Sequence, residues 1–354
     1  MIIILLAFFL TVFFIKVSYK PAMVIGLLDI PDGRKNHLGE IPLTGGLAVF
    51  LAVCIAVILQ GNIFYQFPVL FASLFFVLTI GLLDDLYDLS TRIRLFAQVF
   101  AALMIVLPGQ VYLTDLGDII GFGNVKLHWL SIPFTVFCVV GIVNAINMID
   151  GIDGLAGGVV FIALVLFGVA AGITGIDSCV TLIFILVSAI LAFIAFNMRF
   201  PWRKKAAVFL GDAGSTMLGL FLAWIAIYIT NHHVSSAGLS PIAAVWIVGV
   251  PVLDTLSLMS RRMLKGRSPF SADCEHIHHI LLRAGFSYPQ TLMLILSISL
   301  AMGLFGLGGW YIGMPEYIMF YAFVIAFIIY FTSIHYAWKT MKLIRIVHDK
   351  WNRK

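Results

Sequence analysis

Four short polar stretches interrupt an otherwise apolar sequence, and their residue types suit phosphate and metal chemistry. In order, they hold Asp84, Asp85 and Asp88; Asn147, Asp150 and Asp153; Asp212 within Gly211–Ser215; and His276, His278 and His279. Neighbouring carboxylates at the edge of an apolar run repel one another unless they share a cation or a proton. Hard oxygen ligands favour Mg²⁺ or Mn²⁺ over zinc. The pattern therefore predicts a divalent-metal site, provided that the stretches converge in space.

Each acidic stretch also has a simpler interpretation. Asp84 and Asp85 could mark the end of a helix, although one charge would be enough to end an apolar run. The glycines after Asp150 and Asp153 allow a tight turn that gathers carboxylates and N–H groups, but ordinary interhelical turns have the same composition. Asp212 lies where a helix is expected to begin, so it is either an N-cap or a metal ligand beside a diphosphate bound at the helix N-terminus.

The histidine stretch follows a basic one that contains Arg261, Arg262 and Arg267. A zinc site would need matched cysteines or further ligands, so we favour histidines that hydrogen-bond phosphate oxygens and arginines that clamp them. The alternative is an ordinary basic cytoplasmic loop. Asp254 precedes Arg261 near the same helix face, which predicts a buried ion pair between them.

Apolar helices must position these stretches. Of the 354 residues, 62% are hydrophobic and only 11% are charged, and the mean hydropathy is +1.07, so lipid is the main solvent of this chain. Apolar segments occur near residues 1–17, 47–60, 68–83, 93–107, 132–147, 155–175, 178–196, 213–230, 241–259, 290–312 and 315–337. We predict a single all-α domain, residues 1–354, that forms a polytopic integral membrane bundle of about 11 transmembrane helices.

The basic residues indicate the orientation. Every Lys and Arg except Lys126 falls in alternate connections or in the C-terminal tail. Because basic loops stay in the cytoplasm, the N-terminus is predicted outside and the C-terminus inside. The polar stretches fall on the same cytoplasmic side, where the predicted active-site loops lie near 18–46, 84–92, 147–154, 197–212 and 260–289. The net charge of +5 is then a topology signal, since no basic stripe interleaved with aromatics suggests nucleic-acid binding.

Taken together, the motifs resemble those of the polyprenyl-phosphate N-acetylhexosamine-1-phosphate transferases. They are Asp84-Asp85-Leu-Tyr-Asp88, Asn147-Met-Ile-Asp150-Gly-Ile-Asp153-Gly-Leu, Gly211-Asp-Ala-Gly-Ser215 and His276-Ile-His-His279, spread in order over most of the chain. The basic histidine loop is similar to that of the bacterial branch that transfers N-acetylglucosamine 1-phosphate at the start of O-antigen and enterobacterial common antigen synthesis. The N-terminal stretch 26–46, which holds Arg34, His37 and Thr44, is similar to the same branch.

The resemblance implies a reaction in which UDP-N-acetylglucosamine and undecaprenyl phosphate give undecaprenyl-diphospho-N-acetylglucosamine and UMP at the inner face of the bacterial cytoplasmic membrane. It implies Mg²⁺, with Mn²⁺ as a substitute, held by Asp212 and Asn147, and it leaves room for a homodimer. Asp84 would orient or deprotonate the lipid phosphate with help from Asp85. The implied nucleotide-sugar contacts are Asp150, Asp153, Arg261, Arg262, Arg267, His276, His278 and His279, and the implied lipid-phosphate or diphosphate contacts are Arg34, His37 and Thr44.

Three other functions remain in view. A peptidoglycan-type phospho-N-acetylmuramoyl-pentapeptide transferase belongs to the same family but usually carries a different histidine loop. A secondary transporter would also have many spans, yet its coupling carboxylates lie near the bilayer midplane, whereas these acids flank the spans. An intramembrane aspartyl protease would need two aspartates inside facing helices, for which Asp84 and Asp254 are candidates, and would leave the other motifs unused.

Overall fold

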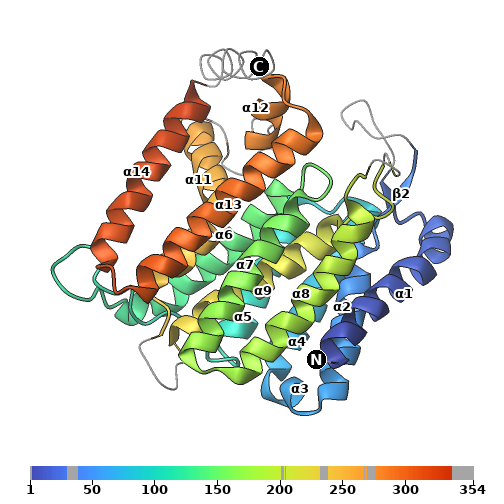
Figure 1. Ribbon diagram of the computed structural model, residues 1–354, viewed down its shortest axis with the longest axis horizontal. Coiled ribbons are helices and arrows are strands. Elements are labelled where there is room, and N and C mark those ends of the chain that lie inside the picture. The colour runs from blue at the N-terminus through green and yellow to red at the C-terminus, as the bar shows by residue number, and fades with distance from the viewer. Residues whose placement is uncertain are drawn as a thin grey trace.

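The computed structural model describes residues 2–29, 39–200, 203, 205–231, 238–266, 268 and 276–336 (Figure 1). Most of these residues lie in helices. The helices are α1 (Ile2–Ile25), α2 (Gly45–Gln60), α3 (Asn62–Gln66), α4 (Pro68–Tyr87), α5 (Thr91–Val106), α6 (Ser131–Ile149), α7 (Leu155–Thr174), α8 (Asp177–Asn197), α9 (Gly211–Asn231), α10 (Pro241–Ile247), α11 (Gly249–Leu264), α12 (Ile277–Arg283), α13 (Tyr288–Tyr311) and α14 (Glu316–His335), with a short 3₁₀ turn at His128–Leu130.

Two short strands depart from the all-helical expectation. Strand β1 (Leu28–Asp29) pairs antiparallel with β2 (Ile41–Pro42). The residues after β2 then meet the segment that leads into α9, because the N–H groups of Gly45 and Gly46 donate to the carbonyl oxygens of Phe209 and Leu210. This backbone ladder ties the start of α2 to the start of α9.

The described helices make the chain a polytopic helical membrane protein. Eight of them are long and apolar enough to cross a membrane, and the pair α10 and α11, bent by 86°, would add a ninth as a broken span. The two remaining predicted segments, α2 and α5, are helical but have only 16 residues each. All eleven apolar segments of the sequence therefore fold as helices, although not all of them are full-length straight spans.

Helix α9 lies at the centre of the bundle and packs against α2, α4, α6 and α7 (Figure 1). Lipid tails are as apolar as leucine side chains, so helices in a membrane gain most from close packing at small residues. At Gly46 and at Gly81 an added Cβ would overlap the backbone of α9, at Gly214 and Ala213 respectively. These glycines let α2 and α4 approach α9 closely near its N-terminal end.

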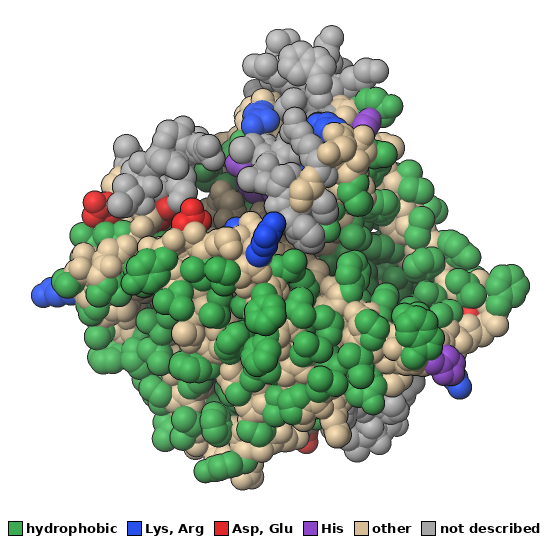
Figure 2. Space-filling view, turned by 180° about the vertical axis from the view of Figure 1, so that it is seen from behind, with side chains coloured by type: hydrophobic (Ala, Val, Ile, Leu, Met, Phe, Trp, Pro, Cys, Tyr) green, Lys and Arg blue, Asp and Glu red, His purple; other side chains and the backbone are tan. Residues whose placement is uncertain are grey.

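The outer surface separates apolar from charged residues. Figure 2 shows hydrophobic side chains over most of the body, with acidic, basic and histidine side chains gathered mainly at its upper end. Large apolar side chains on the outer helices α1, α13 and α14 are exposed, among them Phe9, Met293 and Ile325. Such a surface suits lipid contact rather than water.

The close contact at Gly46 yields a stability prediction. Gly46→Ala adds a methyl group where the backbone of α9 already lies, so we expect a loss of about 1 to 3 kcal/mol in the free energy of unfolding. In α13 an added Cβ at Gly308 would meet nothing within 4 Å, so Gly308→Ala is the matched control and should be neutral or slightly stabilising. Thermal unfolding of the detergent-purified variants measures both. Equal midpoints for the two variants would contradict the packing argument.

Candidate active site

The carboxylate of Asp85 closes the N-terminal end of α9. Its Oδ1 accepts a hydrogen bond from the N–H of Asp212 at 2.8 Å, and its Oδ2 accepts one from the N–H of Ala213 at 3.2 Å. The first N–H groups of a helix have no partner within the helix, so a carboxylate there is favourable. Gly211 fits because its φ is +75° and an added Cβ would lie 2.5 Å from Asp85 Oδ2. Two motifs far apart in the sequence are thus held together.

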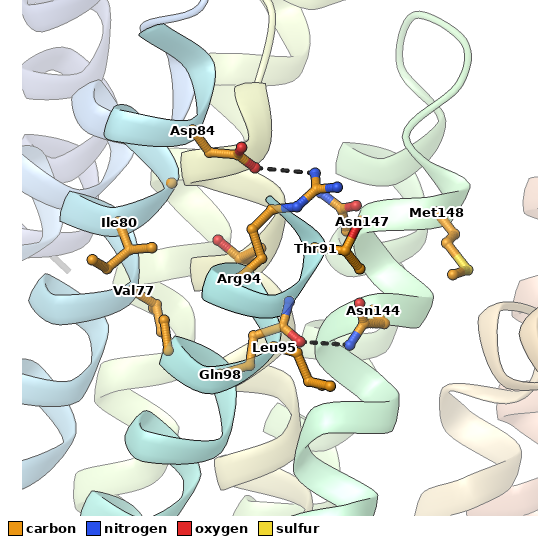
Figure 3. A pocket seen from close by; sticks show the side chains of 13 residues that line it. Val77, Ile80, Asp84, Thr91, Arg94, Leu95, Gln98, Asn144, Asn147 and Met148 are labelled. Atoms are coloured by element: carbon orange, nitrogen blue, oxygen red, sulfur yellow. Dashed lines mark hydrogen bonds and ion pairs between the residues drawn. The ribbon is translucent and has the colours of Figure 1, made fainter. Parts of the chain in front are cut away.

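Asp84 is buried beside a basic partner that the sequence analysis used only as a topology signal. Its Oδ1 accepts from the N–H of Leu89 at 2.8 Å, and its Oδ2 accepts from Arg94 Nη1 at 3.1 Å (Figure 3). The same Nη1 lies 3.9 Å from Asp212 Oδ2. Arg94 therefore belongs to the site. The signal that could have revealed it is an arginine in the helix that follows two adjacent aspartates, which need a cation nearby.

Asn147, at the end of α6, contacts Asp212 directly. The two residues predicted to share a metal ion therefore lie side by side. The Asn147 Nδ2 donates to Asp212 Oδ1 at 2.5 Å and to Ser215 Oγ at 2.9 Å. Asp84, Asp85, Asn147 and Asp212 thus come together from α4, α6 and α9. Ser215, part of the glycine-rich motif but absent from the predicted site residues, completes this contact.

A pocket opens beside these groups, between α4, α5 and α6 (Figure 3). Its empty volume is about 750 Å³, including the solvent at its mouth. It is lined by Val77, Ile80, Gly81, Asp84, Thr91, Arg94, Leu95, Ala97, Gln98, Asn144, Asn147, Met148 and Thr216. Asp84, Arg94 and Asn147 lie at one end in Figure 3. The other end holds apolar side chains such as Val77 and Leu95, together with Gln98 and Asn144, which are hydrogen-bonded to each other at 2.6 Å. The pocket therefore joins a charged end to an uncharged, largely apolar interior.

The loop after α6 carries the second pair of predicted acids. Asp153 Oδ2 pairs with Arg199 Nε at 2.5 Å, and the Arg199 guanidinium stacks over the Tyr288 ring at 4.1 Å. Asn197 Oδ1 accepts from the N–H of Gly154 at 2.6 Å, which ties the loop to the end of α8. The Asp150 side chain is exposed. Arg199 was not among the predicted site residues, yet it neutralises Asp153.

The histidine segment lies against this loop. The His278 ring is 1% exposed and fills the space where a Cβ of Gly151 would be. Its ring lies 4.2 Å from that of His279 and 5.7 Å from that of His276, between centroids. Burial, reinforced by the neighbouring histidines, lowers the pKa of His278 to about 3. His278 is therefore neutral at physiological pH, and Gly151 is needed for the close approach.

The partner of Asp254 differs from the predicted one. Instead of pairing with Arg261, the Asp254 carboxylate binds His276 Nδ1 at 2.6 Å. Arg261 is half-buried and Arg262 is buried, both near the end of α11. Spacing along one helix face had suggested Arg261, but the acid finds its partner on another helix.

The predicted lipid-phosphate contacts are only partly described. Arg34 and His37 lie outside the described residues, as does Arg267. Thr44 is buried and accepts a hydrogen bond from Ser18 Oγ at 3.0 Å. It lines a separate pocket that also contains Lys16, Lys20 and Lys205. Thr44 is thus not among the residues around the pocket that contains Asp84.

The donor set at Asp212 fits a magnesium ion shared with a phosphate. Asp212 supplies carboxylate oxygens, and the Asn147 amide supplies an oxygen once it is turned over. Within the described part of the chain, no group of three or more His, Cys, Asp or Glu side chains could hold a metal. Magnesium, however, typically takes one or two carboxylates together with substrate phosphates and waters, rather than an all-protein cage.

Fold and site together define an integral membrane helical protein with an acidic, phosphate-suited centre at one end of its bundle. Residues 67–230 match the model of glycosyl transferase family 4. Similar proteins named undecaprenyl-phosphate alpha-N-acetylglucosaminyl 1-phosphate transferase come from Escherichia coli strain K12, Haemophilus influenzae and Yersinia pestis. They are respectively 35%, 36% and 34% identical, over 98%, 95% and 96% of this chain and 94%, 95% and 92% of the relative. This chain therefore belongs to that transferase family, which confirms the resemblance carried by the motifs.

The buried His278 yields a prediction for stability against pH. Its pKa is about 3 when folded and about 6.5 when unfolded, so between these values the unfolded state binds the extra proton. The free energy of unfolding should therefore fall as the pH drops below about 6.5, by about 1.4 kcal/mol at pH 5.5. Denaturant unfolding at pH 7.5 and 5.5 measures this loss. His278→Gln cannot titrate and should lack this part of it; parallel behaviour of the two proteins would contradict a buried neutral histidine.

Proposed function

We propose that this protein transfers N-acetylglucosamine 1-phosphate from UDP-N-acetylglucosamine to undecaprenyl phosphate, giving undecaprenyl-diphospho-N-acetylglucosamine and UMP. The observation that carries the proposal is the meeting of Asp84, Asn147 and Asp212, from three helices, beside the charged end of a pocket with an uncharged, largely apolar interior. A polyprenyl phosphate likewise joins a charged phosphate to a long apolar chain. The named relatives, similar over nearly the full chain, supply the substrate identities.

In this reaction, an oxygen of the lipid phosphate attacks the phosphorus that carries the sugar. The bond from that phosphorus to the bridging oxygen breaks, and UMP leaves with that oxygen and its electron pair. Phosphoryl transfer depends mainly on positioning and on neutralising the charge of the phosphates. Arg94, 3.1 Å from Asp84 and 3.9 Å from Asp212, supplies a positive charge where the two phosphates would meet.

Asp84 would orient the lipid phosphate through Arg94 rather than act as an obligatory base. A phosphate monoester has its second pKa near ~6, so most of it is already dianionic at neutral pH. The attacking oxygen then has no proton to lose. Asp85, occupied by two N–H groups of α9, would support the reaction by fixing Asp212 beside Asn147.

Asp212 and Asn147 would hold Mg²⁺, or Mn²⁺ in its place. When bound, the ion would neutralise phosphate charge and so favour departure of UMP. On the nucleotide side, Asp153 would contact the uridine and Asp150 would add a further contact with the nucleotide sugar. The histidine segment with Arg261, Arg262 and Arg267 would contact phosphate or sugar. The packing of His278 on Gly151 supports this grouping, because it brings the histidines to the aspartate loop.

The orientation follows from where the charges gather. We propose a bacterial cytoplasmic-membrane location with eleven crossings, the N-terminus outside and the site facing the cytoplasm. In Figure 1, α1 begins at the lower end of the bundle and α14 ends at the upper end, as an odd number of crossings requires. Helix α2 contributes 16 residues, about 24 Å at 1.5 Å per residue, which is somewhat less than the ~30 Å hydrocarbon core.

Activity is tested with purified protein, radiolabelled UDP-N-acetylglucosamine and undecaprenyl phosphate. We expect a lipid-extractable labelled product that disappears with EDTA and returns with excess Mg²⁺. Asp212→Asn should reduce its formation by at least about 100-fold, because the variant loses the charge that holds the ion. Asp118→Asn, a change to an acid at the opposite end of the bundle, is the control and should keep activity.

Two results would count against parts of this proposal. Product formation that is unaffected by chelation would refute the metal role. Transfer from UDP-N-acetylmuramoyl-pentapeptide in preference to UDP-N-acetylglucosamine would assign the protein to the peptidoglycan branch instead.

The orientation is tested by labelling single cysteines with a membrane-impermeant thiol reagent in a variant without the native cysteines. Cysteines that replace Asp150 and Met263 should react only in inside-out vesicles, and one that replaces Phe122 only in right-side-out vesicles. These three side chains are exposed. Labelling of Asp150→Cys and Met263→Cys from opposite sides would show that no common reaction centre exists.

A further inference from the structure

Asp254, a buried carboxylate in the C-terminal half of the chain, takes no part in the reaction proposed above. The Asp254 residue, on α11, is only 1% exposed. It accepts hydrogen bonds from three groups: His276 Nδ1 at 2.6 Å, Tyr330 O–H at 2.6 Å and the N–H of Ile277 at 3.2 Å. A buried carboxylate without hydrogen-bond partners is costly. Removal of any one of these three donors should therefore destabilise the contact, because the other two cannot fully replace it.

The three donors come from two further helices. His276 is the N-cap residue of α12 and Ile277 is its first residue, so Asp254 binds both a side chain and a backbone N–H where α12 begins. Tyr330 belongs to α14 and is bound to the same oxygen, Oδ1, as Ile277. Asp254 thereby fixes the start of α12 relative to α11 and α14.

Helix α12 in turn contacts the aspartate loop. His278, two residues beyond His276, packs its ring against Gly151, between Asp150 and Asp153. A continuous set of contacts therefore runs from Tyr330 through Asp254 and His276 to the loop. Because an ionised carboxylate only accepts, Nδ1 of His276 carries the proton that is hydrogen-bonded to Asp254.

Asp254 and Tyr330 do not themselves line the pocket beside Asp84, and both lie outside residues 67–230, which the family model matches. Their direct contact is with His276. We propose that Asp254 and Tyr330 are positioning residues, which hold His276 and the rest of α12 against the aspartate loop and so set the affinity for the nucleotide sugar. This inference rests on the proposed function, since it assigns the histidine segment to that substrate.

The first test separates the two substrates. Tyr330→Phe removes one hydrogen bond and keeps the ring, and Asp254→Asn keeps the side-chain shape but removes the charge. We expect the KM for UDP-N-acetylglucosamine to rise about 3- to 10-fold in Tyr330→Phe and more in Asp254→Asn, while the KM for undecaprenyl phosphate stays within twofold. Tyr321→Phe removes a hydroxyl from an exposed tyrosine of the same helix and should leave both KM values unchanged.

A purely structural role would give a different pattern. Loss of folded protein lowers the apparent kcat and leaves both KM values as they are, and a general distortion raises both. Either result would overturn the proposal. In a double-mutant cycle, Asp254→Asn and His276→Gln should together raise the KM for the nucleotide sugar by much less than the product of their separate effects. Independent effects would show that Asp254 does not act through His276.

A second test needs no activity. In a variant without native cysteines, Gly151→Cys and His278→Cys are introduced together and treated with a mild oxidant or a short bis-maleimide crosslinker. We expect this double-cysteine protein to crosslink. Adding Asp254→Asn or Tyr330→Phe should slow the crosslinking rate at least threefold, and adding Tyr321→Phe should leave it unchanged. Equal rates in all variants would refute the positioning role. If the unmodified protein forms no lipid product but these rates differ, the proposed function fails while the positioning of α12 stands.

Discussion

The site depends on one interaction, the binding of the first N–H groups of α9 by the Asp85 carboxylate. Helix α9 lies at the centre of the bundle, so whatever binds its N-terminal end is placed relative to most of the other helices. Asp85 brings the end of α4 to that position, and the close contacts at Gly46 and Gly81 remove the side-chain bulk that would keep the helices apart. Asp84 and Asp212 then face each other across Arg94 as a consequence. The backbone N–H groups at the start of α9 thus determine where these carboxylates lie.

The second half of the site is built by the same means, from buried or partly buried polar groups that satisfy one another. Asp153 is neutralised by Arg199, whose guanidinium stacks on Tyr288 of α13. Asp254 is satisfied by donors from α12 and α14. Because unpaired polar groups are costly near lipid, each such contact fixes the helices that contribute to it. The late helices α11, α13 and α14 therefore do more than span the membrane, since together with the short α12 they support the loop that follows α6.

Much of this arrangement could be predicted from the sequence, because acids at the edges of apolar runs are rare and need an explanation. The meeting of Asp84, Asn147 and Asp212 followed from that reasoning together with the family resemblance. The partners could not be predicted in the same way. Asp254 and Arg261 share a helix face, yet the pair forms with His276, which local spacing does not place near. Arg94 and Arg199 were counted only as basic loop residues, since their partners lie on other segments. The 86° bend between α10 and α11 had local signals in Gly249 and Pro251, but the continuous apolar run at 241–259 had suggested a single straight segment.

Three aspartates that look alike in the sequence differ in the charge that surrounds them. Asp85 is compensated by two backbone N–H groups, and Asp84 by a backbone N–H and Arg94 at 3.1 Å. The Asp212 carboxylate has the neutral amide of Asn147 and, at 3.9 Å, the same Arg94. Since Arg94 already binds Asp84, the negative charge of Asp212 is the least compensated of the three. Its side chain is also more exposed than that of Asp84, at 37% against 4%. The differences among these three acids follow from their hydrogen bonds and not from their residue type, and they favour Asp212 as the proposed site of a cation brought by a diphosphate.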